Sequence, residues 1–502
     1  MDWNSISLGL AWIVIFLYTL ALVVVFVFSA TQAYLAWKYT HSKKYKPEAP
    51  QWKFNGTDSF PAVTIQLPIF NELYVIKRLL TAITALEYPK ELLEIQVLDD
   101  STDESVALTA QLVAAYQNQG FTIEHLRRKE RTGFKAGALK AGLTSAKGTL
   151  IAIFDADFIP PKEWLLRTVP YFKDEKIGVV QTRWGHLNTN YSLLTKVQAF
   201  ALDAHFTLEQ TGRNSQGHFI NFNGTAGIWR KACILDAGNW EGDTLTEDLD
   251  LSYRAQLKQW KFKYLEEIET PAELPVTISA VRSQQFRWNK GGAENFQKMI
   301  RKVWTHPQLS LATKFHASIH LLSSSMFLGV LSLALLSVPM LYIKSYWIGF
   351  AWYFNLSALF FVSTLFFFIG YWPSYHEAYG SGWKGFVNYL PRFSLFYTLA
   401  MGFSLHNTRA IMEGHMGKKS PFVRTPKFNI KTVSDSWKNN KYLPTKLSVN
   451  VLWEAVLALY FLFGIYSAFH LGVAGEWGLL PFHCLLFIGF SFIVFQSFRD
   501  RH

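Results

Sequence analysis

The chain has 502 residues, of which 50% are hydrophobic and 17% are charged, and its formal net charge is +12. This mixture is too polar for a bundle made only of membrane helices and too apolar for an ordinary soluble protein, so we expect a soluble domain joined to membrane-spanning segments. Two cysteines, Cys233 and Cys484, provide neither a disulfide framework nor a zinc pattern. The basic residues gather beside apolar stretches rather than along one helix face, which argues against nucleic-acid binding and in favour of contact with the lipid bilayer.

The first apolar stretch, residues 8–37, carries no charged residue and is longer than the roughly 20 residues that a spanning helix needs. Lys38, Lys43, Lys44 and Lys46 follow it directly. Because basic residues tend to stay on the cytoplasmic side, the N-terminus is predicted to face outwards and the next segment to face the cytoplasm. We therefore predict a transmembrane helix within residues 1–45.

Residues 46–283 are predicted to form one cytosolic α/β domain. Short apolar runs alternate with helical patterns, which is typical of a mostly parallel sheet covered by helices on both faces. Strands are expected over residues 62–67, 93–98, 121–126 and 149–154. In such sheets, ligands bind beyond the C-terminal ends of the strands.

Acidic residues follow two of these strands. Asp155 and Asp157 come directly after the fourth strand, where two carboxylates can hold a divalent cation that bridges a diphosphate. Asp99 and Asp100 follow the second strand and could contact a nucleotide; a solvated turn or a helix cap is the alternative for both pairs. Lys135 stands between glycines at the start of a predicted helix, a position that suits a phosphate, although the pattern does not match the known nucleotide loop.

A third acidic group lies in the stretch 221–253, where Thr246-Glu247-Asp248 precedes a helical pattern. A carboxylate held at a helix N-terminus can act as a general base. The alternative is a capping box at the start of a surface helix.

The pattern changes at Gln284-Gln285-Phe286-Arg287-Trp288, which opens a basic amphipathic run to Trp304. We predict an interfacial helix over residues 284–310. The tryptophan and the basic residues could simply anchor this helix at the membrane surface. Alternatively they form a sugar platform, in which Trp288 stacks on a sugar ring while Gln284 and Arg287 donate hydrogen bonds.

Residues 311–502 are predicted to form a membrane region. Spanning helices are expected over residues 315–343, 346–371, 451–470 and 477–498. The apolar stretch 388–406 carries Pro391 and Arg392, and if it spanned the membrane, the basic loop 409–449 would lie outside. We prefer a surface or re-entrant position for it, which gives five spanning helices and keeps that loop, together with Arg499 and Arg501, in the cytosol.

The ordered set of motifs Asp-Asp, Asp-x-Asp, Thr-Glu-Asp and Gln-x-x-Arg-Trp resembles the family 2 inverting glycosyltransferases of the cellulose synthase superfamily. The runs 134–140, 222–227 and 246–251 look like the mannan and glucomannan synthase-like branch, the cellulose synthase-like A and C types. The run 422–427, Phe-Val-Arg-Thr-Pro-Lys, is similar to the gating loop of that family, which closes over the nucleotide. This match is looser, because Arg424 stands where the family pattern has valine.

The resemblance implies an α/β fold of the GT-A type, that of nucleotide-diphospho-sugar transferases, inserted among transmembrane helices. It also implies a role for each candidate residue. Asp155 and Asp157 would hold Mg²⁺ or Mn²⁺ on the donor diphosphate, Asp99, Asp100 and Lys135 would bind the nucleotide, Asp248 would be the base, and Glu247, Gln284, Arg287 and Trp288 would bind the diphosphate and the acceptor sugar.

On this basis we expect a processive glycosyltransferase of the plasma (inner) membrane that polymerises a hexose from a nucleotide-sugar onto a polysaccharide acceptor. The donor would be GDP-mannose, for a β-1,4-mannan or glucomannan, or UDP-glucose, for a β-1,4-glucan. Two alternatives remain open at this point. One is a non-processive enzyme that makes a glycolipid on ceramide, diacylglycerol or polyprenyl phosphate, and the other is a transporter or channel with an inactive domain.

Overall fold

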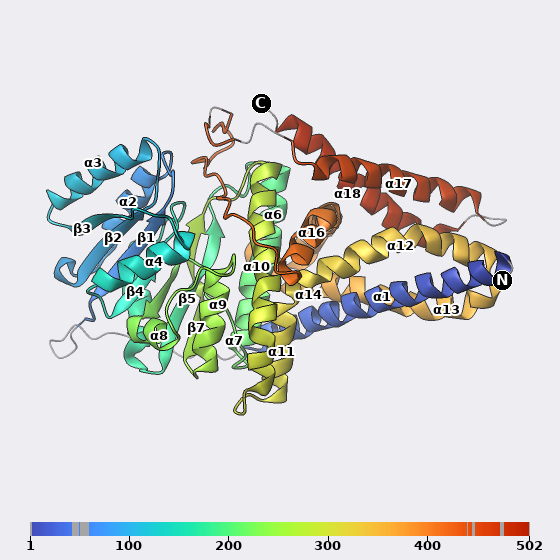
Figure 1. Cartoon of the computed structure of the whole chain (residues 1–502), viewed down its shortest axis with the longest axis horizontal. Coiled ribbons are helices and arrows are strands. Elements are labelled where there is room, and N and C mark those ends of the chain that lie inside the picture. The colour runs from blue at the N-terminus through green and yellow to red at the C-terminus, as the bar shows by residue number, and fades with distance from the viewer. Residues whose placement is uncertain are drawn as a thin grey trace.

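The structure is a computed structural model that describes residues 3–42, 50, 60–438, 440–443, 447–471 and 476–500. A sheet domain lies at one end of the molecule, and long helices extend away from it (Figure 1). Lys43, Lys44, Lys46 and Arg501, on which the predicted orientation partly depends, lie outside the described residues.

The sheet has seven strands in the order β3-β2-β1-β4-β6-β5-β7. Its strands are β1 (Val63–Ile69), β2 (Leu93–Asp99), β3 (Thr122–Arg127), β4 (Leu150–Ile153), β5 (Ile177–His186), β6 (Gly227–Arg230) and β7 (Lys261–Ala272). β6 runs antiparallel to both of its neighbours, and the other pairs are parallel. The four predicted strands and the mostly parallel sheet are confirmed, whereas β5, β6 and β7 were not predicted.

Helices cover both faces of this sheet. Successive residues of β4 show why: Ala152 belongs to one hydrophobic core, while Ile151 and Ile153 belong to a second core on the opposite face. Both cores are closed by apolar side chains from the surrounding helices. The helices of this domain are α2 (Ile76–Thr84), α3 (Ser105–Gln117), α4 (Phe134–Ser145), α5 (Trp164–Thr168), α6 (Leu193–Ala204), α7 (Gln210–Asn214), α8 (Lys231–Asp236) and α9 (Glu247–Leu257).

α10 (Ile278–Thr305) stands between the sheet domain and the long helices, and it packs against α16 (Ser404–His415) (Figure 1). We predicted that this helix begins at Gln284, but it begins at Ile278, because the Thr277 side chain accepts a hydrogen bond from the backbone N–H of Ala280 and caps the first turn. The predicted domain boundary between residues 283 and 284 therefore cuts a continuous helix.

Five helices of the described chain are long and apolar enough to cross a membrane, which agrees with the number predicted and indicates a membrane protein. The candidate spans are Ser7–Ser42, Ser323–Tyr346, Ala351–Tyr379, Asn450–His470 and Trp477–Arg499. They contain α1 (Trp3–Ser42), α12 (Met326–Tyr346), α13 (Ala351–Ser357), α14 (Phe361–Tyr379), α17 (Asn450–His470) and α18 (Leu480–Arg499).

Two boundaries in this region differ from expectation. The predicted span 315–343 is wrong at its start, because residues 311–321 form a separate helix, α11 (Leu311–Leu321), whose His316 and His320 contact aromatic side chains of α1 and α9. The stretch 388–406 is divided between α15 (Gly382–Gly402) and α16. α15 is not one of the five candidate spans and packs against α18, so its surface position stays a prediction.

Candidate active site

A pocket lies at the edge of the sheet where β1 and β4 end, and α9 and α10 close its other side. It gathers every predicted site residue except Asp99. Its walls include Asp100, Lys135, Asp155, Asp157, Glu247, Asp248, Gln284, Arg287 and Trp288. Residues far apart in the sequence, from strand ends, from a helix start and from the Gln-x-x-Arg-Trp motif, thus share one cavity.

Asp99 and Asp100 point to different places. The Asp99 carboxylate is buried and accepts hydrogen bonds from the Ser101 backbone N–H (2.8 Å) and from His125 Nε2 (2.7 Å). Although burial opposes ionisation, these hydrogen bonds lower the pKa of Asp99. Asp100 lines the pocket and accepts a bidentate pair from Arg128, at 3.0 Å and 2.5 Å. Adjacent residues at a strand end face opposite sides, so only Asp100 is placed for the nucleotide contact expected of both.

Lys135 joins two of the predicted groups. Its Nζ lies 2.6 Å from Asp155 Oδ1 and donates to the Gly224 carbonyl oxygen at 2.9 Å. Burial alone would lower the pKa of Lys135, but the carboxylates of Asp155, Glu247 and Asp248 around it raise the pKa. The ammonium group therefore stays charged in the pocket, where it can face a phosphate.

Gly224 brings the backbone against the predicted base. Its φ of +80° favours glycine, and a Cβ atom there would lie 2.8 Å from Asp248 Oδ2. The turn at residues 223–225 thus requires glycine at position 224 for two reasons: the backbone conformation and the space that Asp248 occupies.

Asp248 lies in the first turn of α9. The expected alternative, a capping box, is wrong, because the Thr246 side chain makes no cap hydrogen bond and instead accepts from Asn295 Nδ2 at 2.9 Å. Burial and the adjacent Glu247 carboxylate raise the pKa of Asp248 to about 7, against the opposing charge of Lys135. Burial also raises the pKa of Glu247. A carboxyl group whose pKa is close to neutrality suits a general base.

The segment 422–427 lies across the pocket. Lys427 Nζ is 2.7 Å from Asp157 Oδ1, and Arg424 Nη1 is 2.7 Å from Glu72 Oε2. Arg287 donates to Thr425 Oγ1 at 2.8 Å and lies over the Phe422 ring. The segment that resembles a gating loop is therefore closed against the predicted donor site.

Asp155 and Asp157 offer the oxygen ligands that Mg²⁺ and Mn²⁺ prefer. The side chain of Asp157 is 3% exposed, and its Oδ1 is buried with no hydrogen-bond partner of its own besides the ion pair with Lys427. A buried carboxylate oxygen balanced by a lysine from a separate segment can exchange that lysine for another cation. The two residues therefore fit the metal that the sequence predicts.

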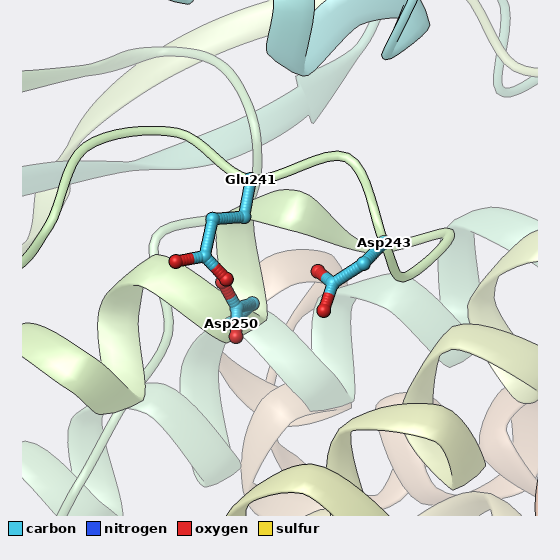
Figure 2. Close-up of side chains that lie close together, drawn as sticks. All are labelled: Glu241, Asp243 and Asp250. Atoms are coloured by element: carbon cyan, nitrogen blue, oxygen red, sulfur yellow. The ribbon is translucent and has the colours of Figure 1, made fainter.

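A second group of carboxylates, Glu241, Asp243 and Asp250, has oxygens within 4.8 Å of one another (Figure 2). Lys298 Nζ lies 2.6 Å from Glu241, 2.8 Å from Asp243 and 2.8 Å from Asp250. Arg254 also pairs with Asp250, at 2.6 Å. The cation position in this group is thus filled by an ammonium group, which makes it a structural ion network rather than a metal site.

The pocket also contains residues that were not among the predicted site residues, and three of them are Glu72, Arg131 and His186. Glu72 follows β1 as Asp155 follows β4, so the rule that ligands bind at strand ends could have identified it. Burial raises its pKa to about 7, although Arg424 opposes the shift. Arg131 lies 3.4 Å above the centre of the Phe70 ring. His186 ends β5, which was not predicted, so no sequence signal pointed to it.

A second cavity, of about 270 Å³, adjoins the pocket, because Leu202, Gln284 and Trp288 line both. It lies among the helices, and its walls are mainly apolar. They include Val25, Leu194, Phe327, Phe367, Phe396 and Tyr397. Trp288 thus stands between the charged pocket and the cavity among the helices.

Comparisons with known proteins agree with this arrangement. Residues 61–291 match the family model described as glycosyltransferase like family 2. The chain is 41% identical over 287 residues to probable glucomannan 4-beta-mannosyltransferase 7 of Oryza sativa subsp. japonica, covering 56% of this chain and 49% of that protein. It is also 41% identical over 278 residues to glucomannan 4-beta-mannosyltransferase 9 of Arabidopsis thaliana, covering 54% of this chain and 52% of that protein. The chain spans about half the length of the curated relatives that it matches.

Among solved structures, the mannosyltransferase PcManGT of Pyrobaculum calidifontis, in complex with GDP-Man and Mn²⁺, is similar with a TM-score of 0.52 at 17% identity. The match covers 80% of this chain and all of that chain. At this identity the similarity concerns the fold, and it confirms the predicted GT-A type. Residues 61–291 thus resemble the glycosyltransferases of family 2, and the sheet has a GT-A-like fold.

Proposed function

We propose that the protein is a membrane-embedded, metal-dependent inverting glycosyltransferase that transfers mannose from GDP-mannose and extends a β-1,4-linked mannan or glucomannan. The observation that carries the proposal is the single pocket in which Asp248, Asp155, Asp157 and Trp288 meet and beside which a second cavity lies among the helices. The choice of mannose rests on relatives named glucomannan 4-beta-mannosyltransferases, and a solved structure of similar fold contains GDP-Man.

In the proposed reaction, Asp248 accepts the proton of the acceptor hydroxyl as that oxygen forms a bond to the anomeric carbon of the donor sugar. The bond between this carbon and the diphosphate oxygen breaks on the opposite face, so the configuration inverts and an α-linked donor gives a β-linked product. The raised pKa of Asp248 strengthens it as a base relative to an ordinary aspartate.

Negative charge develops on the leaving diphosphate, and Lys135 and Arg287 line the pocket with fixed positive charge for it. A divalent cation held by Asp155 and Asp157 would offset more of that charge. Arg424 and Lys427 line the same pocket. Donor binding therefore requires the segment 422–427 to open first, and its closure afterwards would exclude water.

The acceptor would lie at Trp288, whose ring offers a stacking surface for a sugar. From there the growing chain would enter the second cavity, which begins at Gln284 and Trp288. We further propose that the sheet domain faces the cytosol, where nucleotide-sugars are made, and that the membrane is the plasma (inner) membrane.

The test is nucleotide release by the purified full chain in detergent with Mn²⁺ or Mg²⁺, with GDP-mannose, UDP-glucose and UDP-N-acetylglucosamine supplied separately. We expect release of GDP from GDP-mannose, and an insoluble product that a β-mannanase digests. Asp248→Asn is the control for background hydrolysis. Release from UDP-glucose with a product sensitive to β-glucanase would show that the transferred sugar is glucose rather than mannose. No release from any donor would contradict the proposal that the protein is a glycosyltransferase.

A second candidate function is favoured by one specific observation, the apolar walls of the second cavity. A lipid acceptor, such as a polyprenyl phosphate, would fit such walls, and the enzyme would then add a single sugar. The same reaction mixtures distinguish the two functions, because a glycolipid is extracted into organic solvent and resists β-mannanase.

A further inference from the structure

A third cavity, of about 540 Å³, lies behind the segment that crosses the active-site pocket. Its walls come from α10, α16, residues 418–423 and the ends of two candidate membrane spans, at Val451 of α17 and Ser497 of α18. Because spans end where the bilayer ends, this cavity lies at the membrane surface on the side of the sheet domain. We call it the basic cavity, after Arg282, Arg287, Arg409, Lys418 and Lys419, which line it.

Positive charge in the basic cavity exceeds the negative charge that faces it. Five basic side chains line it, against two acidic ones, Glu413 and Asp500. Glu413 is shared between Arg409 at 3.2 Å and Lys418 at 3.4 Å. Arg287 also faces the carboxylates of the active-site pocket. When Arg287 is left out and Glu454, which pairs with Arg282 at 2.5 Å, is added to the acidic side, one positive charge remains in excess.

Arg282 gives a second and independent sign of a missing anion. Its side chain is enclosed, with 6% of the residue exposed, and its Nε is buried without a hydrogen-bond partner. The Nε of Arg287 is also buried without a partner. A buried donor without an acceptor is costly, and guanidinium groups bind phosphate oxygens particularly well.

The remaining walls are apolar and include Phe286, Val423 and Val451. A free phosphate would gain nothing from these side chains, whereas the glycerol and upper acyl carbons of a phospholipid would cover them. A phospholipid at the membrane surface would pair its phosphate with the basic side chains and cover the apolar side chains with its glycerol and acyl carbons.

Side chains of the segment 421–424 alternate between the two cavities. Pro421 and Val423 line the basic cavity, and Phe422 and Arg424 line the active-site pocket. The base of the segment is attached to α10, because the fully buried Lys290 donates to the Lys418 carbonyl oxygen and to Ser420 Oγ, both at 2.5 Å. A molecule in the basic cavity would therefore press directly on the back of the segment.

We infer that the basic cavity binds the headgroup of an anionic phospholipid from the leaflet beside the sheet domain, and that the bound headgroup holds the segment 418–427 closed. The binding site does not depend on the proposed reaction. Its consequence for catalysis rests on the proposed function, so both readouts below are independent of activity.

The first readout is lipid retention. The full chain, reconstituted in nanodiscs of phosphatidylcholine with or without phosphatidylglycerol, is examined by native mass spectrometry for bound phosphatidylglycerol. We expect the double variant Arg409→Gln/Lys419→Gln to bind it about thirtyfold more weakly than the parent chain, since each charge near a membrane surface contributes about fivefold. The matched control, Lys258→Gln/Lys261→Gln, removes two exposed charges that do not line the cavity, and it should bind as the parent does.

Equal retention of phosphatidylglycerol by the parent and by the double variant would contradict the proposal that the basic cavity binds the lipid. Lys419→Gln alone removes an exposed side chain and guards against a folding defect in the double variant; it should still weaken binding severalfold.

The second readout is hydrogen exchange in residues 418–430 of the parent chain, which should slow when phosphatidylglycerol is added. Unchanged exchange would overturn the effect on the segment. Glycerol phosphate and inorganic phosphate serve as soluble probes, and slowing by either of them as great as that by the lipid would overturn the lipid assignment in favour of a free phosphate compound.

Discussion

The sheet domain contains two groups of carboxylates that meet lysines, and they differ in where the lysines come from. Lys298 belongs to the long helix α10 and meets Glu241, Asp243 and Asp250, the three side chains that Figure 2 shows. Lys427, which pairs with Asp157, belongs to an irregular segment between α16 and α17. Lys298 is fixed by a packed helix, whereas Lys427 lies on a segment whose opening would leave Asp157 available. Lys135 of the helix α4 pairs with Asp155, so this contrast concerns Asp157. Proximity of acidic groups alone therefore does not identify a metal site.

The largest effect expected in the active-site pocket is that of Asp248→Asn. The amide keeps the size of the side chain but does not accept a proton, so activity should fall about 10³-fold. The melting temperature should stay the same or rise, because the change removes a buried carboxylate beside Glu247. Initial rates of nucleotide release measure the first effect and thermal unfolding measures the second. If Asp248→Asn kept a tenth or more of the parent rate, Asp248 would not be the general base.

Removal of the proposed metal-binding carboxylate should distinguish the two groups by their effect on Mn²⁺ dependence. Asp157→Asn is expected to lower activity about 10²-fold and to raise the Mn²⁺ concentration required for half-maximal rate. Asp243→Asn, in the group that Lys298 fills, should leave that Mn²⁺ concentration unchanged. Calorimetric titration of Mn²⁺ in the presence of GDP gives a readout separate from turnover. If Asp243→Asn weakened Mn²⁺ binding as much as Asp157→Asn, the distinction drawn between the two groups would be wrong.

Removing the lysine of the second group, rather than a carboxylate, tests how much this group contributes to stability. Lys298→Met leaves three carboxylates without their shared cation, and Asp250 among them is fully buried. Breaking a buried ion pair costs about 3–5 kcal/mol, but Glu241 and Asp243 are partly exposed, so we expect a loss of about 2 kcal/mol in the free energy of unfolding. Chemical denaturation of the full chain in detergent measures it. The same change at an exposed lysine, Lys258→Met, should cost much less.

The sequence predicted the parts of the site that depend on local patterns. Asp100, Asp155 and Asp157 were identified because each follows an apolar strand, and Asp248 because it opens a helical pattern. The inward direction of Asp99 depends on a partner on the neighbouring strand, His125, and strand neighbours are not readable from local sequence.

There are also physical reasons why the strand β5 and the role of Lys298 were not predicted. β5 contains Gln181, Thr182 and Arg183, whose polarity hides the strand, although the first two are buried and hydrogen-bonded to the backbone of residues 225–226. The role of Lys298 follows from three acidic residues about 50 positions away meeting it in space. Contacts of that range arise from packing rather than from any periodicity in the chain.

The smallest effect expected is a shift in the pH dependence of the rate. Because burial and Glu247 raise the pKa of Asp248 to about 7, and only the deprotonated form accepts a proton, kcat/KM should fall tenfold per pH unit below that value and level off above it. Glu247→Gln removes the like charge, so the pKa of Asp248 should fall and the acidic limb should move to lower pH. Asp243→Asn, a change of the same charge in the Lys298 group, should leave the profile where it is. An acidic limb that does not move in Glu247→Gln would mean that the titrating group is not Asp248, and that the base must be sought elsewhere in the pocket.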